Sequence, residues 1–449
     1  MRLYYFMKTT ITYKDIWQIA YPIMIGAIAE NINTAINTAF VGQLGQVSVG
    51  AVGLGGLFYF NFAILALGLA GGIQTIIGRR NGEEHFEEAG TILTHGMILF
   101  TFLALLMLGL MHLFASSLLR YFISSTQIYE ACASYLSIRM YGIVFICLMV
   151  CLRSFYIGIT HTRVITIITF LSAGINVLFD YLLIFGHGPF KKYGIIGAAY
   201  SSILAEGIAF GGYFLITMFI PVVKKYKALR FSKFQIKYIW NILKTGTPLM
   251  IQSWVSFSSW LLFFIVIEKI GERTLAVSTI IKNIYMLFMI PLWGFAAASN
   301  SLTANIIGQN RTEEVINLLR KIAWLATLIV AIPVVICFCF PEPIIGIFTN
   351  RSDIIMEGTA PLRIVAVALL MFPAAFVFLN GVSGSGDTKF ALYIELVTIL
   401  IYVSYFVSMA KVWHMGISFI WTAELVYMVL MGLGSYWRLK SGLWKGKIV

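Results

Sequence analysis

A series of apolar stretches, each about twenty residues or longer, is the feature of this sequence that most restricts its fold. A helix of about twenty apolar residues crosses the hydrocarbon core of a bilayer. The short alternating segments of a membrane β-barrel are not found. We therefore predict an all-α integral membrane protein with 12 transmembrane helices, over residues 16–40, 48–77, 91–115, 133–156, 164–186, 195–220, 246–269, 275–307, 320–341, 360–383, 390–412 and 416–437.

The charged residues agree with this class and predict an orientation. The chain is 59% hydrophobic and 11% charged, and its formal net charge is +13. With the N-terminus inside, the cytoplasmic segments hold roughly three times as many Lys and Arg as the outside loops, which is the usual bias. We expect both termini in the cytoplasm, a multi-pass location in the cell (inner) membrane with lipids as partners, and no nucleic-acid binding. The first residues are interpreted as a retained tail and not a signal peptide.

The two halves of the sequence look like copies of each other. "PIMIGAIAENINTAINTAFVGQLG" (22–45) aligns with "PLMIQSWVSFSSWLLFFIVIEKIG" (248–271), an offset of 248 − 22 = 226, and "GITHTR" (158–163) aligns with "GSGDTK" (384–389) at the same offset. Because each copy holds six helices, an even number, we predict two six-helix lobes related by a parallel pseudo-two-fold repeat. The expected parts are an N-terminal tail 1–15, an N-lobe 16–220, a cytoplasmic linker 221–245, a C-lobe 246–437 and a C-terminal tail 438–449.

The first apolar stretch carries polar residues at helical spacing. Glu30, Asn33, Thr34 and Asn37 follow i, i+3, i+4, i+7 spacing and so share one face of a helix. Such a stripe cannot face lipid and must face protein or a watery cavity. Two interpretations stay open: hydrogen bonds between helices, or a proton or cation site that includes Glu30 and Asn37.

A second polar pair lies in the fifth stretch, "SAGINVLFDYLLIFG". Asn176 and Asp180 are four residues apart and share a face. An ionised aspartate at this depth is costly, about 2.5–3.5 kcal/mol on insertion scales. The carboxyl is therefore suited to binding and releasing a proton, or to forming part of a transient Na⁺ site together with Asn176. The alternative is a structural carboxyl satisfied by its neighbours.

The repeat is asymmetric at these positions. At the 226 offset, Glu30 and Asn37 meet Ser256 and Phe263, and Asn176 and Asp180 meet Tyr402 and Phe406. We predict that ion handling belongs to the first lobe. The second lobe would line a substrate cleft with Ser256, Phe263, Tyr402 and Phe406, a surface suited to greasy cationic compounds.

Other residues carry weaker signals. Pro22 weakens the first helix and provides a possible bend or only a static kink. Glu206, Glu395 and Glu424 lie in apolar spans, and Arg139 and Lys282 could either pair with them or extend toward the membrane surface. The five cysteines show no metal-ligand or disulfide spacing, and no catalytic motif is present, so we expect neither an enzyme nor a cofactor other than H⁺ or Na⁺ as coupling ion.

Several motifs together resemble the multidrug and toxic compound extrusion (MATE) family of secondary transporters. They are "NTAFVGQLG" (37–45), "IIGRRNG" (76–82), "NVLFDYLLIFG" (176–186), "GIIGAAYSS" (194–202) and "GSGDTK" (384–389). The resemblance implies drug/cation antiport driven by Na⁺ or protons. It implies a cation site at Asn176, Asp180 and Ser202, with Tyr141 as a further candidate, and a bending proline at Pro22. Asn37 stands where many members have aspartate, so Glu30 is a candidate replacement, and Ser256 stands where some have glutamate.

The function expected from these residues is export of amphipathic, often cationic organic compounds by an ion-coupled antiporter that works by alternating access, as a monomer. A flippase for a lipid-linked precursor is the alternative, and it should place several basic residues in the cleft. A non-transporting scaffold would need no buried acids confined to one lobe. A channel would need a ring of like polar groups, which the sequence does not offer.

Overall fold

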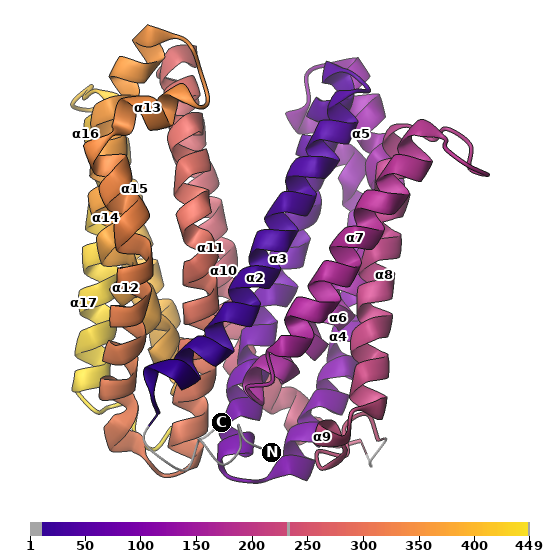
Figure 1. Ribbon diagram of the computed structural model, residues 1–449, viewed down its shortest axis with the longest axis vertical. Coiled ribbons are helices and arrows are strands. Elements are labelled where there is room, and N and C mark those ends of the chain that lie inside the picture. Colours follow the sequence, from indigo (N-terminus) through magenta and orange to yellow (C-terminus); the bar gives the residue numbers. More distant parts are fainter. Residues whose placement is uncertain (1–10, 231–233, 448–449) are drawn as a thin grey trace. The chain divides into compact units, whose positions relative to one another are not determined.

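The computed structural model describes residues 11–230 and 234–447, and this part of the chain is almost entirely helical, with no β-strand (Figure 1). The elements are α2 (Tyr13–Gly42), α3 (Gln46–Gly82), α4 (Phe86–Phe122), α5 (Thr126–Arg139), α6 (Gly142–Gly158), α7 (Arg163–Phe185), α8 (Ile195–Phe219), α9 (Pro221–Lys224), α10 (Ile236–Glu268), α11 (Glu272–Gly308), the 3₁₀ turn η1 (Thr312–Glu314), α12 (Val315–Cys339), α13 (Pro341–Gly346), α14 (Ser352–Gly384), α15 (Thr388–Lys411), α16 (Ile417–Trp421) and α17 (Ala423–Lys440).

These helices confirm the predicted fold class. Within the described residues, 11 helices are long and apolar enough to span a membrane, and the number is 12 if the bent pair α5 and α6 forms one span. That pair corresponds to the fourth predicted span, 133–156, which we expected as one continuous helix. It is instead bent by 51° between Arg139 and Gly142. Apolar length predicted where the chain crosses the membrane, but it did not predict this break.

The internal repeat is visible in glycine positions. Gly45 precedes α3 with φ 103° and Gly271 precedes α11 with φ 155°, values that side chains disfavour. Gly68 and Gly294 also correspond at the offset of 226. A Cβ at Gly68 would lie 2.7 Å from the Leu249 carbonyl oxygen of α10, and a Cβ at Gly294 would lie 2.9 Å from the Ala20 carbonyl oxygen of α2. The first helix of each copy thus packs closely against a helix of the other copy.

The helices form two compact units. The chain passes from one unit to the other within α2 and again within α10. Unit 2 comprises Ile25–Met250, and unit 1 comprises the described residues up to Met24 and from Ile251 onward. The two boundaries, after Met24 in α2 and after Met250 in α10, are again 226 residues apart. They do not coincide with the linker at 221–245 that the sequence suggested. The lobe boundaries expected from the sequence stay a prediction, and parts of the expected tails lie outside the described residues.

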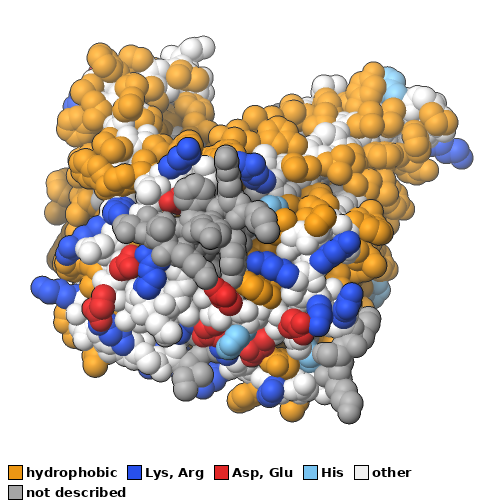
Figure 2. Space-filling model, turned by 60° about the horizontal axis from the view of Figure 1, so that its bottom comes forward, with side chains coloured by type: hydrophobic (Ala, Val, Ile, Leu, Met, Phe, Trp, Pro, Cys, Tyr) orange, Lys and Arg blue, Asp and Glu red, His pale blue; other side chains and the backbone are white. Residues whose placement is uncertain are grey.

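The polar middle segment is attached to unit 2. The Tyr226 hydroxyl donates a hydrogen bond of 2.5 Å to Asn81 Oδ1 at the end of α3, and the Tyr226 ring meets Phe86 and Phe155 edge-on. The Lys225 ammonium lies 3.7 Å from the centroid of the Phe86 ring. Figure 2 shows Lys, Arg, Asp and Glu side chains gathered on the face that lies at the bottom of Figure 1, where α9 lies.

Candidate ion-binding site

A buried polar cluster in unit 2 is built by α2, α7 and α8. On α7, Asn176 and Asp180 are one turn apart and point to the same side, where α8 packs closely. This close approach depends on Gly197 of α8, because a Cβ there would lie 2.6 Å from the carbonyl oxygen of Leu183. Asn176 is 3% exposed and Asp180 is 0% exposed. The predicted pair therefore shares one interior face, as its spacing indicated.

The Asp180 carboxylate receives hydrogen bonds from neutral groups. Asn37 Nδ2 on α2 donates to Oδ2 at 3.2 Å, and the Ser201 hydroxyl on α8 donates to Oδ1. No Lys, Arg or His in the described chain lies within 4.0 Å of this carboxylate. A buried anion without a paired cation is unfavourable. The site is therefore arranged to accept a positive charge, either a proton on the carboxyl or a small cation beside it.

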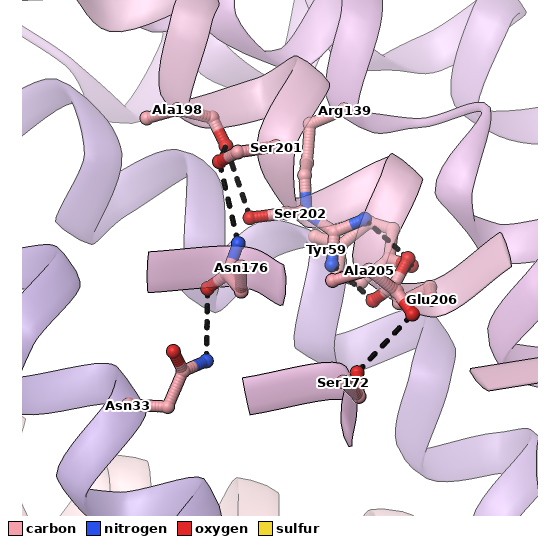
Figure 3. Close-up of polar contacts among 10 residues, drawn as sticks. All are labelled: Asn33, Tyr59, Arg139, Ser172, Asn176, Ala198, Ser201, Ser202, Ala205 and Glu206. Carbon is pink, nitrogen blue, oxygen red and sulfur yellow. Dashed lines mark hydrogen bonds and ion pairs between the residues drawn. The ribbon is translucent and has the colours of Figure 1, made fainter. Parts of the chain in front are cut away.

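Asn176 extends this network to a second residue of α2. Its amide nitrogen donates to Ser201 Oγ at 3.3 Å, and its amide oxygen accepts from Asn33 Nδ2 at 2.8 Å (Figure 3). The Asn33 amide oxygen is buried and has no hydrogen-bond partner in the described chain. Carboxylate, amide and hydroxyl oxygens are the ligands that hard cations prefer. Asp180, Asn176, Ser201 and Asn33 thus supply the oxygen atoms that Na⁺ would need, whereas a proton would need Asp180 alone.

An apolar cluster lies one turn beyond this site. Ile184 follows Asp180 by one turn on α7, and Val41 follows Asn37 by one turn on α2. Tyr135 of α5 with Ala198 and Ala199 of α8 completes the cluster, and each of the five is at most 5% exposed. These five side chains are packed together and buried from solvent.

A buried ion pair occupies the other side of α8. The Arg139 guanidinium of α5 binds both carboxylate oxygens of Glu206, with Nη1–Oε2 at 2.8 Å and Nη2–Oε1 at 2.5 Å. It also lies 3.7 Å from the centroid of the Tyr59 ring of α3. Arg139 is the partner that the sequence suggested for one of the membrane acids. Figure 3 shows this ion pair with Tyr59, in the same view as Asn176 and Ser201.

Gly142, which follows the bend between α5 and α6, lies against this ion pair. A Cβ at Gly142 would clash with the Arg139 guanidinium and lie 2.5 Å from Glu206 Oε2. Glycine at the first position of α6 therefore leaves room for the two charged groups.

Two residues that the family resemblance suggested have other surroundings. Ser202 donates its hydroxyl to the Ala198 carbonyl oxygen at 3.0 Å, and the serine that meets Asp180 is its neighbour Ser201. Tyr141 lies at the break before α6 and is 48% exposed. Tyr135 of α5 lies in the apolar cluster one turn beyond Asp180. Sequence reasoning missed Ser201.

Glu30 and Pro22 both lie on α2, before the part of the helix that contacts Asp180. Glu30 on α2 forms an ion pair of 3.2 Å with Arg153 of α6, and its side chain is 49% exposed. It lies two turns before Asn37, about 10 Å along the helix, and so is not a neighbour of Asp180. Pro22 is buried, and α2 continues through it as one helix. Whether the helix bends there in a transport cycle stays a prediction.

Unit 1 holds buried acids as well as the expected aromatic residues. The Ser256 hydroxyl donates to Glu395 Oε1 at 2.6 Å, as does the Tyr427 hydroxyl at 2.5 Å, while Oε2 is buried without a hydrogen-bond partner in the described chain. The Tyr402 hydroxyl donates to Glu424 at 2.9 Å. The sequence comparison of the two copies placed ionisable groups in the first, but these two acids lie in the second.

The substrate-cleft candidates pack against one another. The Phe263 ring stacks with Tyr402 and meets Phe406 and Trp421 edge-on, with centroids 5.0 to 6.1 Å apart. All four rings are buried in the core of unit 1. In this state they have almost no exposed surface, so contact with a substrate would require them to separate. Two of the cleft candidates bond to acids, the partly buried Ser256 to Glu395 and Tyr402 to Glu424.

A helical membrane protein with a buried carboxyl–amide cluster in one of two repeated halves is of the kind expected for a secondary transporter. A family model described as MatE matches residues 22–182 and 248–407. The chain belongs to this family, whose members are transporters and not enzymes. The two matches begin 226 residues apart, so the two halves of the chain are copies of the same unit.

Individual relatives support this assignment at low sequence identity. The probable multidrug resistance protein NorM of Thermotoga maritima is 24% identical over 446 residues, which cover 97% of this chain and 94% of the relative. NorM of Pasteurella multocida is 22% identical, covering 100% of this chain and 93% of the relative. Among solved structures, a MOP superfamily transporter from Pyrococcus furiosus has a TM-score of 0.88 at 22% identity and 97% coverage of both chains. An outward-facing multidrug resistance MATE family transporter has a TM-score of 0.86 at 22% identity and 96% coverage of both.

Proposed function

We propose that this protein exports amphipathic, often cationic organic compounds in exchange for H⁺ or Na⁺. The family membership and the names of the multidrug resistance relatives support the substrate class. The observation that carries the ion coupling is Asp180, a fully buried carboxyl that accepts hydrogen bonds from Asn37 and Ser201 and has no paired cation in the described residues.

The coupling follows from the charge of the cluster. With the site empty, Asp180 is a buried anion, which favours a state that opens the site to water. A bound proton or Na⁺ removes this charge and lets α2 and α7 close on each other. Alternation between the two states would carry the ion inward and the drug outward. The membrane potential contributes about 2.3 kcal/mol per charge per 100 mV, and a pH gradient contributes about 1.4 kcal/mol per unit.

The topology completes this proposal. We place the protein in the inner membrane as a monomer, with both termini in the cytoplasm. The basic segments between the helices support this orientation. On this orientation, the apolar cluster around Val41 and Ile184 lies on the outer side of Asp180. The ion would then leave Asp180 toward the cytoplasm when the cluster is closed.

The alternative, a flippase for a lipid-linked precursor, receives less support from the side chains. It would need free basic groups at membrane depth to hold an anionic headgroup. Arg139 already binds Glu206, and Arg363 is exposed and donates to the Phe338 carbonyl oxygen at 3.2 Å.

The test is efflux from proteoliposomes with an imposed ion gradient. We expect Asp180→Asn to abolish ion-driven efflux of a cationic dye while the purified variant retains a cooperative thermal transition. Asp15→Asn is the matched control, because Asp15 is a carboxylate at the exposed start of α2 whose side chain bonds, within the described residues, to Thr12. Efflux at the wild-type rate by Asp180→Asn would contradict the proposal.

A further inference from the structure

Unit 1 holds a buried carboxyl that the proposed exchange does not use. Glu395 of α15 is 1% exposed. Its Oε1 atom accepts two hydrogen bonds, from the Ser256 hydroxyl of α10 at 2.6 Å and from the Tyr427 hydroxyl of α17 at 2.5 Å. Its Oε2 atom is buried and has no hydrogen-bond partner in the described chain. One oxygen of this carboxyl is therefore satisfied, and the other is not.

A second unsatisfied oxygen belongs to the helix that carries Ser256. Gln252 lies one turn before Ser256 on α10, and its amide Oε1 is buried without a hydrogen-bond partner among the described residues. The Ser256 hydroxyl lies 2.8 Å from the Gln252 backbone carbonyl oxygen and 2.6 Å from Glu395 Oε1, so it connects the two residues. Buried polar atoms rarely lack a partner. Two such acceptors around one hydroxyl indicate a place where a cation can bind.

No basic side chain neutralises this carboxyl. In the part of the chain that the structure describes, no Lys, Arg or His nitrogen lies within 4.0 Å of Glu395. Lys282 of α11 lies instead 5.5 Å from the centroid of the Phe264 ring, and Arg438 binds Asp387. An ionised Glu395 would thus be a buried charge held by two neutral hydroxyl groups, which is unfavourable without a cation.

The internal repeat relates this carboxyl to the helices of the Asp180 site. At the offset of 226, α10 and α15 correspond to α2 and α7, and α17 overlaps the counterpart of α8. Glu395 corresponds to residue 395 − 226 = 169, which lies 180 − 169 = 11 residues before Asp180 on α7. That spacing is about 16 Å along a helix. The same three helices of each copy therefore hold an unpaired carboxyl, but at different levels.

We propose that Glu395 Oε2, Gln252 Oε1 and Ser256 Oγ bind Na⁺ in unit 1, at a site separate from Asp180. Carboxylate, amide and hydroxyl oxygens are the ligands that hard cations prefer, and one ion binds several of them at once. A proton on Oε2 would remove the charge of Glu395 but would leave Gln252 Oε1 without a partner. The inference does not rest on the proposed role of Asp180, because the two sites share no residue.

Sodium binding at this site is linked to the loss of a proton. Without Na⁺, burial favours the protonated carboxyl, since an isolated buried charge is costly. When Na⁺ binds, the carboxyl O–H bond breaks, the carboxylate binds the ion and the proton passes to solvent, so the charge of the site is unchanged. Each bound Na⁺ should therefore release about one proton, and Na⁺ affinity should rise with pH.

The experiment counts radioactive Na⁺ bound to purified protein in detergent, in the Asp180→Asn background so that the first site does not contribute. At about pH 8.5 this protein is expected to bind about one Na⁺ per chain, and to bind less at about pH 6. Addition of Glu395→Gln is expected to abolish this binding. Addition of Gln252→Met keeps the length of the side chain but removes its oxygen, and is expected to weaken binding about tenfold. A pH indicator dye measures the released proton.

The matched control is another buried acid of unit 1. The titratable groups beside the site are Tyr427, Tyr402, Tyr285 and Glu424, and Glu424 is the carboxyl among them. It is 4% exposed, and both of its oxygens accept hydroxyl hydrogen bonds, from Tyr402 at 2.9 Å and from Tyr285 at 3.5 Å. Glu424→Gln therefore removes a carboxyl of similar burial that is already satisfied, and the Na⁺ count is expected to stay the same.

The outcomes separate this inference from the proposed function. The inference is overturned if the Asp180→Asn protein binds no Na⁺, or binds it equally with and without Glu395. A proton, a buried water molecule or a rotated Gln252 amide would then satisfy the two oxygens. If Glu395→Gln does not fold, Gln252→Met decides, and unchanged affinity in that variant overturns the site. Efflux by Asp180→Asn tests the proposed function independently of this count.

Discussion

The hydroxyl of Ser201 provides a sharp test of the site geometry. It donates to Asp180 Oδ1 and accepts from Asn176 Nδ2, whereas the neighbouring Ser202 hydroxyl donates to the Ala198 carbonyl oxygen. Ser201→Ala therefore removes a hydrogen bond to the carboxylate, and Ser202→Ala does not. The two substitutions delete the same atom from adjacent positions of one helix.

The magnitude follows from the charge on the acceptor. A hydrogen bond to a charged group contributes about 1.5–3 kcal/mol, which corresponds to a factor of about 10 to 150 in binding. If the coupling ion is a proton, Ser201→Ala makes the ionised carboxyl less favourable and moves the pH midpoint of efflux upward by about one to two units. If the ion is Na⁺, the loss of an oxygen ligand weakens its activation about tenfold or more.

The assay is dye efflux from proteoliposomes, first across a pH gradient alone and then across a Na⁺ gradient alone. Ser202→Ala is expected to change the free energy of ion binding by less than about 0.5 kcal/mol. The reasoning would be refuted if Ser202→Ala reproduced the shift and Ser201→Ala left the profile unchanged. In that case the family resemblance would have identified the correct serine and the geometry would not.

Three further predictions concern the surroundings of the site. Gly142→Ala is expected to lower the free energy of unfolding by about 1–3 kcal/mol, because the methyl group meets the Arg139 guanidinium; an unchanged melting temperature would speak against the tight contact. Glu30→Gln is expected to keep most ion-driven efflux, because its half-exposed ion pair is two turns from the Asp180 level; loss as complete as in Asp180→Asn would restore Glu30 as an ion ligand. Burial, and then the charge of Arg163, lowers the pKa of His161 in the loop before α7. The unfolded chain therefore binds this proton more readily, and stability falls as the pH drops below about 6.5. His161→Gln should melt with less dependence on pH between about 7.5 and 5.5 than the wild type.

The sequence predicted the spans because length and apolar composition are fixed by the bilayer and not by tertiary contacts. It predicted the pairing of Asn176 with Asp180 for a similar reason, since a four-residue spacing defines a helix face. The repeat was readable in "PIMIG" and "PLMIQ", and it recurs in the glycine pairs that allow close helix contact. These features can be read from composition, local spacing and the alignment of the two copies.

The structure differs from the expected grouping of site residues where two helices must be aligned with each other. Glu30 and Asn37 share a face of α2, but they lie two turns apart along the helix axis. Glu30 therefore pairs with Arg153, whereas Asn37 bonds to Asp180. Ser201 was available from the sequence, because Gly197, Ser201 and Ala205 form a stripe of small residues at four-residue spacing. Such a stripe marks the side of α8 that approaches α7. Ser202 lies about 100° away from it.

The bend at Arg139 could not be read from apolar length. A continuous helix and a broken one have the same composition, and the ion pair beside the break joins Arg139 to Glu206, 67 residues later in the chain. The acids of unit 1, Glu395 and Glu424, could be identified in the sequence. The tyrosines that bind them, however, come from different helices. Long-range pairs of this kind are set by packing, which one sequence does not show.

The central claim is that Asp180 binds the coupling ion, and direct ion binding tests it most closely. Purified protein in detergent is titrated with radioactive Na⁺ at neutral pH and, separately, with acid in the absence of Na⁺, and the bound ions are counted per chain. We expect the wild type to take up one Na⁺ or one proton that Asp180→Asn does not. Equal uptake by the two proteins would contradict the account.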